Sequence, residues 1–423
     1  MKIVKLHEAM DAIQSGMRIY AQGMASTPHH LLNGLADRAG SLKDLTLFHL
    51  HLEGPTPWVG PELSAHIRDV SLFVGKNLRE AVNTGLSDYV PIFLSEVPWF
   101  LEQSEFQPDV ALINVSPPDR HGYVSLGPTI EATLAAMRVA SITIAQINPS
   151  VPRVLGDALI PATSITYGVE WDEALSATVV EAVDPLSATI GRHVASLIPD
   201  RATLQLGIGR IPNAVLSQLT HHEDLGIHSE MISDGVRMLV ERGVVTGRYK
   251  ATDPGEIVAT FCMGSEQLYH FLDDNPAVSL RTVDYTNNTA VIRQNPRMIS
   301  INSAIEVDLN GQVAAESIGS HIVSGVGGQM DFVRGASLAP GGRSIIALPS
   351  RTRSGEPRIV ANIRPGAAVT TSRNHVQYVV TEYGVAELHG RSLRERAKQL
   401  IAVAHPDDRE ALEKSARERL PAF

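Results

Sequence analysis

Apolar residues recur along this chain at two spacings, one typical of buried strands and one typical of amphipathic helices. Residues 45–50 and 111–115 are short apolar runs with the length of buried strands. Residues 131–140 instead place small apolar side chains at helical spacing. Strands that alternate with helices in this way are typical of parallel sheets covered by helices. The pattern therefore predicts an α/β fold with mainly parallel sheets.

One stretch of this pattern occurs twice. Residues 11–35 read DAIQSGMRIYAQGMASTPHHLLNGL, and residues 195–219 read ASLIPDRATLQLGIGRIPNAVLSQL. The two segments align without a gap at a constant offset of 184 residues, which places Gly23 on Gly207. Each copy predicts a helix, a strand that ends at glycine, a short loop, and a helix with proline in its first turn. The repeat predicts two related α/β domains in tandem.

Length and composition limit the kind of protein. A chain of 423 residues exceeds one ordinary core, so we expect two domains, residues 1–185 and 186–423. The net charge is −10 without a basic block, which argues against nucleic acid or membrane as a partner and favours a small substrate. Cys262 is the single cysteine, which excludes a disulfide framework. No secretion signal or apolar run of about twenty residues is present, so we expect a cytoplasmic protein.

A single carboxylate is prominent in residues 227–235, IHSEMISDG. Apolar side chains from 232 to 240 follow helical spacing, and Gly243 is placed to end that helix. Glu230 is therefore predicted at a helix start, where unpaired N–H groups and the helix dipole favour negative charge. Such a carboxylate is either a nucleophile or a residue that stabilises the first turn beside Ser229 as N-cap.

Two glycine-rich loops are candidates for binding an anion. Their residues are Gly207, Ile208 and Gly209 in the first loop, and Gly325, Val326, Gly327 and Gly328 in the second. The first departs from the dinucleotide fingerprint because Pro212 replaces the third glycine, and the second lacks the ending of a nucleotide P-loop. Glycine N–H groups ahead of a helix bind an oxyanion or a phosphate. Simple turn geometry is the alternative for each loop.

Two clusters of polar residues have structural alternatives as well. His49, His51 and Glu53 share one face of a possible strand, but a metal site needs further ligands that the spacing does not supply. A polar face that lines a cleft is therefore favoured over a metal site. Asp119 and His121 follow a predicted strand, and they form either a charge pair or an ordinary turn, with the turn favoured.

Several segments, in this order, resemble the acetyl-CoA hydrolase/transferase family, and most closely its branch of 4-hydroxybutyrate CoA-transferase-like proteins. They are ASTPHH at 25–30, SPPDRHGYVSLG at 116–127, NPSVPRVLGD at 148–157, GIGRIPNAV at 207–215, HSEMISDG at 228–235, the stretch 303–332, and YVVTEYG at 378–384. The resemblance implies two tandem, structurally related CoA-transferase domains. It also implies that Glu230 occupies the position of the family's catalytic glutamate.

The resemblance further implies a CoA-transferase that works by a ping-pong mechanism, through an acyl-glutamyl anhydride and a glutamyl-CoA thioester on Glu230. It places the backbone from Gly207 to Gly209 at the oxyanion, and Gly325 to Gly328 against the CoA thioester arm or the glutamyl carbonyl. Acyl-CoA and a short acid would be the substrates: acetate, butyrate, 4-hydroxybutyrate, itaconate or succinate. The family implies no metal, no cofactor beyond the substrate coenzyme A, and a homo-oligomer such as a dimer.

Three other activities remain open from the sequence. In an acyl-CoA hydrolase, water rather than an acid would resolve the Glu230 intermediate. A non-catalytic acyl-CoA-binding protein would use the same glycine loops without the chemistry, and a metal-dependent amidohydrolase would use the histidines. Arg351 and Arg353 either bind a second carboxylate of the acceptor bidentately or belong to a surface loop, and the surface loop is favoured.

Overall fold

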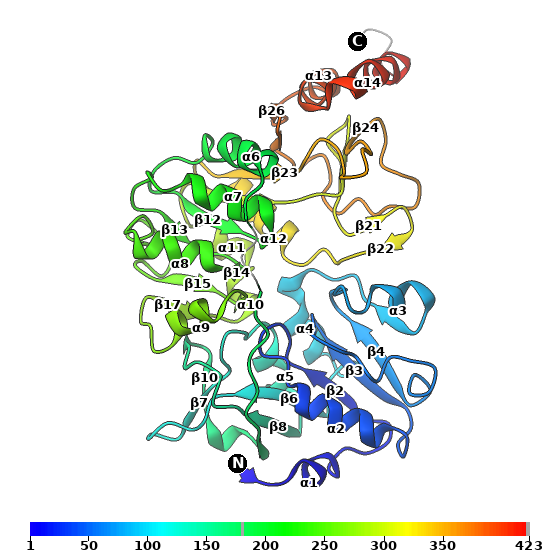
Figure 1. The fold of residues 1–423 in the computed structure, drawn as a ribbon, viewed down its shortest axis with the longest axis vertical. Coiled ribbons are helices and arrows are strands. Elements are labelled where there is room, and N and C mark those ends of the chain that lie inside the picture. Colours follow the sequence, from blue (N-terminus) through cyan, green and yellow to red (C-terminus); the bar gives the residue numbers. More distant parts are fainter. Residues whose placement is uncertain (179–181, 420–423) are drawn as a thin grey trace. The chain divides into compact units, whose positions relative to one another are not determined.

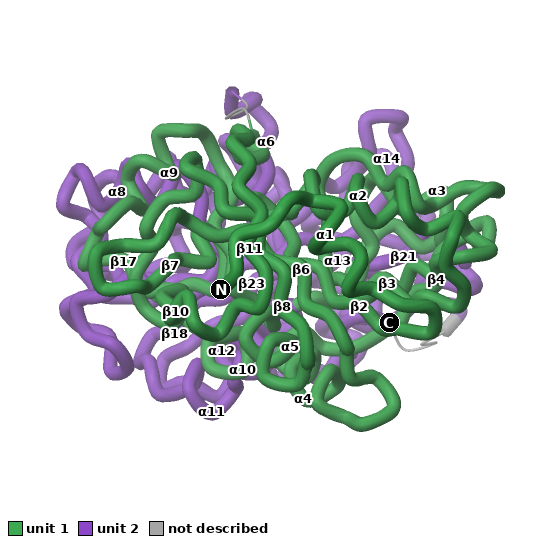
Figure 2. Tube along the Cα trace, turned by 90° about the horizontal axis from the view of Figure 1, so that it is seen from below, with its two compact units in different colours: residues 1–179, 258–286, 322–327 green, residues 180–257, 287–321, 328–423 purple. Residues whose placement is uncertain are grey.

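The computed structural model describes residues 1–178 and 182–419. Over these residues the chain divides into two compact units (Figure 2). Unit 1 contains residues 1–179, 258–286 and 322–327, and unit 2 contains residues 180–257, 287–321 and 328–423. We predicted two domains that are each continuous in sequence, 1–185 and 186–423, and these limits stay a prediction. Each compact unit, in contrast, contains three separate segments of the chain.

Unit 1 is built, over its described residues, on an eight-stranded sheet in the order β1-β11-β8-β6-β2-β3-β4-β5. Its strands are β1 (Lys2–Ile3), β2 (Arg18–Ala21), β3 (Leu45–His49), β4 (Ile67–Ser71), β5 (Ser87–Tyr89), β6 (Val110–Val115), β8 (Ile142–Ile147) and β11 (Tyr167–Glu170). Every neighbouring pair is parallel. All six residues of β6 are buried, as expected for a parallel strand covered on both faces.

The remaining elements of unit 1 are short. The helices are α1 (Leu6–Met10), α2 (His29–Ala39), α3 (Arg79–Thr84), α4 (Val97–Glu102), α5 (Thr133–Val139), α9 (Glu266–Leu272) and α10 (Val283–Thr286). Two small ladders pair β7 (Tyr123–Ser125) with β10 (Leu159–Pro161), antiparallel, and β9 (Leu155–Gly156) with β17 (Val278–Leu280), parallel.

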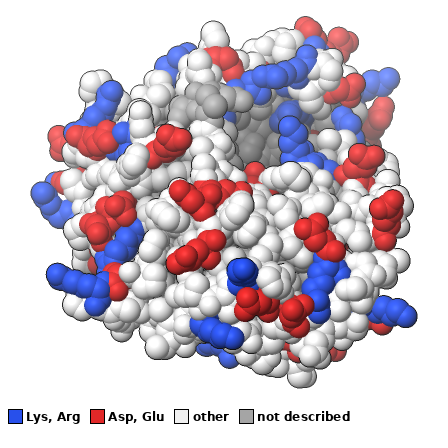
Figure 3. Space-filling model, turned by 60° about the horizontal axis from the view of Figure 1, so that its bottom comes forward, with Lys and Arg blue, Asp and Glu red and all other residues white. Residues whose placement is uncertain are grey.

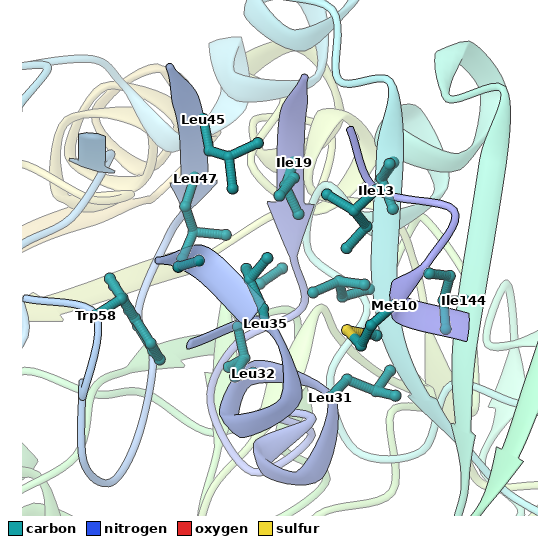
Figure 4. Packing of buried hydrophobic residues seen from close by; sticks show 14 of the residues in the cluster. Met10, Ile13, Ile19, Leu31, Leu32, Leu35, Leu45, Leu47, Trp58 and Ile144 are labelled. Atoms are coloured by element: carbon teal, nitrogen blue, oxygen red, sulfur yellow. The ribbon is translucent and has the colours of Figure 1, made fainter. Parts of the chain in front are cut away.

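The core of unit 1 forms where α2 packs onto the sheet (Figure 4). Leu31, Leu32 and Leu35 of α2 lie at helical spacing and are at most 2 % exposed. They pack in one cluster with Ile19 of β2 and Leu47 of β3. Burying one such side chain contributes roughly 1.5–3 kcal/mol. The apolar stripe of the first repeat copy therefore fixes its helix against its own strand.

Unit 2 is built, within the described residues, on a six-stranded sheet in the order β13-β12-β18-β23-β25-β26. Figure 1 labels β12, β13, β23 and β26 of this sheet. Its strands are β12 (Thr203–Leu206), β13 (Gly226–Ile227), β18 (Met298–Asn302), β23 (Arg343–Ala347), β25 (Tyr378–Thr381) and β26 (Gly384–Glu387). The first five are parallel and β26 is antiparallel to β25. The carboxyl ends of the five parallel strands consequently share one edge of the sheet.

The other elements of unit 2 surround this sheet. The helices are α6 (Pro185–Ala195), α7 (Arg210–Gln218), α8 (Asp234–Glu241), α11 (Thr289–Ile292), α12 (Gln329–Leu338), α13 (Leu393–Val403) and α14 (Pro406–Arg419). Short strands include β14 (Met231–Ile232), β19 (Glu306–Asp308), β20 (Val313–Ala314) and β24 (Ile359–Val360). The predicted α/β fold with mainly parallel sheets is confirmed.

Both copies of the repeat form the predicted strand, glycine loop and helix. In unit 1, β2 leads through Gly23 to α2, and in unit 2, β12 leads through Gly207 to α7. Pro212 lies in the first turn of α7 as expected, whereas Pro28 is the N-cap residue of α2, just before the helix. Pro28 has ψ of 73°, outside the helical region, and therefore ends the loop rather than beginning the helix.

The surface carries both signs of charge. On the face shown in Figure 3, basic and acidic side chains are interspersed. No helix among those described is long and apolar enough to cross a membrane. Cys262 is a free, buried thiol, and its burial raises its pKa well above the usual range. A buried thiol held neutral in this way is a poor nucleophile.

Gly191 provides a test of how closely α6 and α7 must approach. A Cβ at this position would lie 2.8 Å from the carbonyl carbon and oxygen of Ala214 on α7. Overpacking of this kind typically costs about 1–3 kcal/mol, of which the helix preference of alanine offsets up to about 1. We expect Gly191→Ala to lower the urea midpoint of unfolding. Gly40→Ala is the matched control because Gly40 has a helical φ of −57° and open space around it. A variant at 191 as stable as that control would contradict the close packing.

Candidate active site

Glu230 lies on a bend, three residues after the end of β13 and directly before β14, in unit 2. The prediction that it begins the following helix was wrong: α8 starts at Asp234, and its N-cap is Ser233 rather than Ser229. The backbone stays extended through Ser233, at φ −132° and ψ 178°, so the helix begins four residues later than predicted. The end of this helix was predicted correctly, since Gly243 follows it with a left-handed φ of 74°.

The N-terminus of a different helix, α12, contacts the Glu230 carboxylate. Gly328 is the N-cap residue of α12, and its backbone N–H donates a hydrogen bond to Glu230. A Cβ on Gly328 would overlap Oε2 of Glu230, so only glycine allows this approach. The unpaired N–H groups and dipole of a helix start favour a nearby negative charge. The electrostatic reasoning from the sequence therefore applies to α12, not to α8.

Asn287 supplies the second donor to the carboxylate. Its Nδ2 lies 3.1 Å from Oε2 of Glu230 and 3.3 Å from Oδ2 of Asp331, and the residue is fully buried. Asp331 is itself buried in the first turn of α12. One amide thus bridges two carboxylates, which fixes the position of the Glu230 oxygen and brings a second negative charge close to it.

These surroundings set the protonation of Glu230. Burial of the carboxylate raises its pKa from 4.5 to about 7, and the negative charge of Asp331 acts in the same direction. The hydrogen bonds from Asn287 and Gly328 lower the pKa and offset part of that rise. At neutral pH both the acid and the carboxylate are therefore populated. A desolvated carboxylate at this balance is suited to act as a nucleophile.

Ser229 connects the glutamate to the neighbouring strand. Its hydroxyl donates to the carbonyl of Leu206, the last residue of β12, at 3.2 Å. The loop of Gly207, Ile208 and Gly209 starts directly after this residue. Gly209 is the N-cap of α7, and its φ of 115° strongly favours glycine. Space is not the constraint, because a Cβ on Gly207 or Gly209 would have no neighbour within 4 Å. The first glycine loop thus begins at the strand end next to the glutamate.

The second glycine loop is divided between the two units. Gly328 contacts Glu230 as described, whereas Gly325 packs against Phe73 and Tyr89 of unit 1. Gly327, also in unit 1, accepts the backbone N–H of Leu94 at 3.0 Å. Val326 lies between these glycines and is half-buried. Of this loop, Gly328 has direct contact with the candidate nucleophile.

The histidines near the end of β3 have partners of their own in unit 1. Nε2 of buried His49 lies 3.0 Å from Asp69, whose carboxylate also accepts the indole N–H of Trp58 at 2.7 Å. His51 pairs with Glu53 at 3.2 Å. Throughout the described part of the chain, no group of three or more His, Cys, Asp or Glu side chains is arranged to hold a metal ion. Only His49 of the predicted face lies within a strand.

Two further polar sets are structural. Asp119 accepts the backbone N–H groups of His121 at 2.8 Å and Tyr123 at 2.9 Å, which confirms the turn. Arg351 donates to both oxygens of Asp408, at 2.9 and 2.6 Å. Because this bidentate pair already occupies its guanidinium, Arg351 is not placed to bind the second carboxylate of an acceptor.

Sequence reasoning missed Asn287 and the role of Asp331. Asn287 stands in an ordinary polar stretch, YTNNTA, more than fifty residues from Glu230, and no spacing relates the two. Asp331 follows the GVGG segment, and an acid in the first turn of a predicted helix is usually read as a helix-stabilising residue. Only the folded sheet shows that both face the same carboxylate.

The candidate site is thus a half-buried carboxylate with a pKa of about 7 that accepts two N–H donors beside the carboxyl edge of a parallel sheet. The models of the acetyl-CoA hydrolase/transferase N-terminal and C-terminal domains match residues 1–181 and 264–416. The chain belongs to the acetyl-CoA hydrolase/transferase family, and it is an enzyme of the CoA-transferase class.

Individual relatives agree with this assignment. The chain is 46 % identical to a 4-hydroxybutyrate coenzyme A transferase of Clostridium kluyveri, over 99 % of this chain and 98 % of the relative. It is also 46 % identical to a succinyl-CoA:acetate/propanoyl-CoA:succinate CoA transferase of Fasciola hepatica, over 98 % of this chain and 87 % of the relative. The crystal structure of RipA from Yersinia pestis matches with a TM-score of 0.92 at 36 % identity, covering 99 % of this chain and 97 % of RipA.

Gly328 offers a direct test of the site geometry. We expect Gly328→Ala to abolish measurable CoA transfer, because the new methyl group would displace the Glu230 carboxylate from its N–H donor. The fold should persist, and circular dichroism and the melting temperature would verify that. Gly40→Ala is the matched control, since Gly40 lies outside the candidate site, has a helical φ of −57°, and a Cβ there meets open space. Full activity in the variant at 328 would show that the carboxylate does not react from this position.

Proposed function

We propose that this enzyme moves CoA between an acyl-CoA and a short carboxylic acid, with Glu230 as the nucleophile. The observation that carries the proposal is the environment of Glu230: hydrogen bonds from Gly328 and Asn287 position its carboxylate, whose pKa is about 7. Transfer between two acids without ATP requires the acyl group and CoA to stay activated, and a glutamyl anhydride and a glutamyl thioester meet that requirement.

The proposed steps balance as follows. The Glu230 carboxylate attacks the thioester carbonyl of the donor, forms an acyl-glutamyl anhydride and releases CoA thiolate. The thiolate attacks the glutamyl carbonyl, the donor acid leaves as a carboxylate, and Glu230 carries CoA as a thioester. The acceptor carboxylate then attacks this thioester and gives a second anhydride and CoA thiolate. Finally the thiolate attacks the acceptor carbonyl, which yields the new acyl-CoA and restores the Glu230 carboxylate.

Each addition step develops negative charge on a carbonyl oxygen. Losing one preorganised donor to such an oxygen typically costs about 2.7–4 kcal/mol of barrier. We propose Gly328 and Asn287 as donors to the glutamyl oxygen, because both already contact Oε2 or the carboxylate. The backbone from Gly207 to Gly209 remains our candidate for the oxyanion of the acyl group. It follows β12, the strand to which Ser229 is hydrogen-bonded.

The acids are proposed from the relatives. The names of the two curated relatives include 4-hydroxybutyrate in one case, and acetate and succinate in the other. We therefore propose short acids of this size, with butyrate and itaconate as further candidates. A cytoplasmic location and a homo-oligomeric assembly, such as a dimer, are parts of the same proposal.

Hydrolysis is the second candidate function, because the family unites hydrolases and transferases. Water attacking the glutamyl-CoA thioester would give free CoA and regenerate Glu230. The two activities share every residue described above, so they are separated by the acceptor requirement. CoA release from acyl-CoA that is independent of any added acid would favour the hydrolase.

A panel of acids tests the transferase directly. With acetyl-CoA or succinyl-CoA as donor, we expect new acyl-CoA from at least one of acetate, butyrate, 4-hydroxybutyrate, succinate and itaconate. Double-reciprocal plots of the initial rate at several fixed acceptor concentrations should be parallel, as ping-pong kinetics require.

Glu230→Gln should reduce the rate by about a thousandfold or more while leaving the fold intact. Glu241→Gln removes an exposed carboxylate from α8 and is the control. Transfer that persists without the Glu230 carboxylate would refute its role.

The pH dependence of the first half-reaction tests the role of the environment. Protonated Glu230 cannot attack, so kcat/KM for acyl-CoA should rise with pH around an apparent pKa of about 7. Asp331→Asn removes a charge that raises the pKa and should shift the midpoint to lower pH. Asn287→Ala removes a hydrogen bond that lowers the pKa and should shift the midpoint to higher pH. Stopped-flow measurements would give the profiles, and midpoints that shift in the opposite directions would contradict the assignment.

A further inference from the structure

Both hydrogen-bond donors of the Glu230 carboxylate stand at the start of a stretch of unit 2. Asn287 directly follows the unit 1 segment 258–286, and Gly328 directly follows the unit 1 segment 322–327. The second of these segments, which we call the anchored segment, is short. Whatever holds it within unit 1 therefore bears on the position of Gly328.

Helix α3 holds the start of the anchored segment. The side-chain amide of Asn83 donates to the carbonyl of Ile322 at 2.8 Å and accepts the backbone N–H of the same residue at 2.9 Å. Its Nδ2 also donates to the carbonyl of Arg79, one turn earlier in α3, at 2.7 Å. Arg79 lies on the same face of the helix, and its Nε donates to the carbonyl of Val323. The Asn83 amide is thus fixed by its own helix while it binds both backbone groups of Ile322.

The middle and the end of the anchored segment have contacts in unit 1 as well. A Cβ on Gly325 would lie 3.0 Å from Cδ2 of Phe73, which follows β4, so the backbone passes close to the end of that strand. The carbonyl of Gly327 accepts the N–H of Leu94, the first residue of the 3-10 helix η1 (Leu94–Glu96), at 3.0 Å. Unit 1 therefore holds this segment from its first residue to its last carbonyl.

The last of these contacts bears directly on Glu230. The carbonyl of Gly327 and the N–H of Gly328 belong to one peptide unit, which is planar and trans. In such a unit the two groups point in opposite directions, so the direction of the carbonyl fixes the direction of the N–H. The carbonyl accepts from Leu94, and the N–H donates to Glu230. One rigid group thus has its oxygen bound in unit 1 and its N–H bound to the candidate nucleophile.

We propose that Asn83 and Arg79 are positioning residues for CoA transfer: they hold the anchored segment so that the N–H at its end is aimed at Glu230. The proposal rests on the function proposed above, since it concerns the same nucleophile. A hydrogen bond weakens steeply when its angle or its distance departs from the optimum. Release of the anchored segment would therefore weaken the bond from Gly328 without removing any group that contacts the carboxylate.

The segment that leads to Asn287 is anchored in unit 1 by different contacts. Val283 of α10 belongs to the buried hydrophobic cluster that also contains Leu94. The backbone N–H of Val283 donates to the carbonyl of Glu131 at 3.2 Å. Because this anchor uses the core and a backbone hydrogen bond rather than the Asn83 amide, a substitution at Asn83 should disturb the Gly328 donor selectively.

The pKa of Glu230 tests the proposal without any need for activity. The hydrogen bond from Gly328 lowers that pKa, so weakening the bond should raise it. We expect Asn83→Ala to raise the pKa by about 0.5–1, and Arg79→Ala, which removes one hydrogen bond to the segment instead of two, to raise it by less. Asp331 stays in place in both variants, so its charge is constant. Carbon-13 NMR of enzyme labelled at its glutamate carboxyl groups would follow the titration, with the Glu230 signal identified by its loss in Glu230→Gln.

Kinetics provide the second measurement. Asn83→Ala should lower kcat about 10–100-fold with little change in KM for acyl-CoA, because a misplacement of about 1 Å costs a rate of this order. The midpoint of the pH profile of kcat/KM should move to higher pH, since a higher pKa leaves less carboxylate at a given pH. Thr84→Ala is the matched control, because the Thr84 hydroxyl donates to the carbonyl of Glu80 within α3. Lys76→Ala, which removes an exposed positive charge just before α3, is the control for Arg79→Ala.

Hydrogen exchange shows whether the segment has been released. Peptides that cover residues 322–328 should exchange faster in Asn83→Ala than in wild type or Thr84→Ala. A variant that exchanges faster there but keeps the wild-type Glu230 pKa and kcat would overturn the proposal, and so would equal exchange in all variants. Arg79 is exposed, so its variant secures the comparison if Asn83→Ala fails to fold.

The two proposals fail in different ways. A raised Glu230 pKa in Asn83→Ala, in an enzyme that transfers no CoA, would support the positioning role and refute the proposed function. Normal transfer with the same pKa in wild type and Asn83→Ala would support the function and refute the positioning role.

Discussion

The chemistry that we propose for this protein depends on the hydrogen bonds that the N–H of Gly328 and the amide of Asn287 donate to the Glu230 carboxylate. Burial alone would drive the carboxylate toward its neutral acid, which is not nucleophilic. The two donors and the start of α12 restore part of the stability of the anion, and Asp331 opposes them. The balance leaves Glu230 with a pKa of about 7, so that a poorly solvated carboxylate, the form in which a glutamate attacks a thioester, is available at neutral pH.

The parallel sheet of unit 2 explains how distant segments meet at this point. Its strands present their carboxyl ends on one edge, so the residues after β13, β12, β18 and β23 come together although the ends of β12 and β23, Leu206 and Ala347, are far apart in sequence. Glu230 follows the first of these strands, and the first glycine loop follows the second.

The fold was largely predictable from the sequence because it depends on local periodicity. The apolar runs gave β3 and β6, and the duplicated segment gave the strand, glycine and helix of both units. The start of α8 was misplaced, since the pattern of apolar residues does not distinguish an extended Met231–Ile232 from a first helical turn. The contacts of Asn287 and Gly328 with Glu230 were not predictable from the sequence. They are tertiary contacts between segments that share no motif. Glu230 was found by family resemblance, and its physical environment came from the structure.

Trapping the proposed thioester would show whether Glu230 carries CoA during transfer. Enzyme incubated with acyl-CoA alone would be treated with borohydride, which reduces a thioester to an alcohol, and the digested protein would be analysed by mass spectrometry. The account predicts a reduced side chain at Glu230, formed only after incubation with acyl-CoA and absent in Glu230→Gln. A reduced side chain on any other residue, or an unmodified Glu230 in enzyme that is actively transferring CoA, would contradict it.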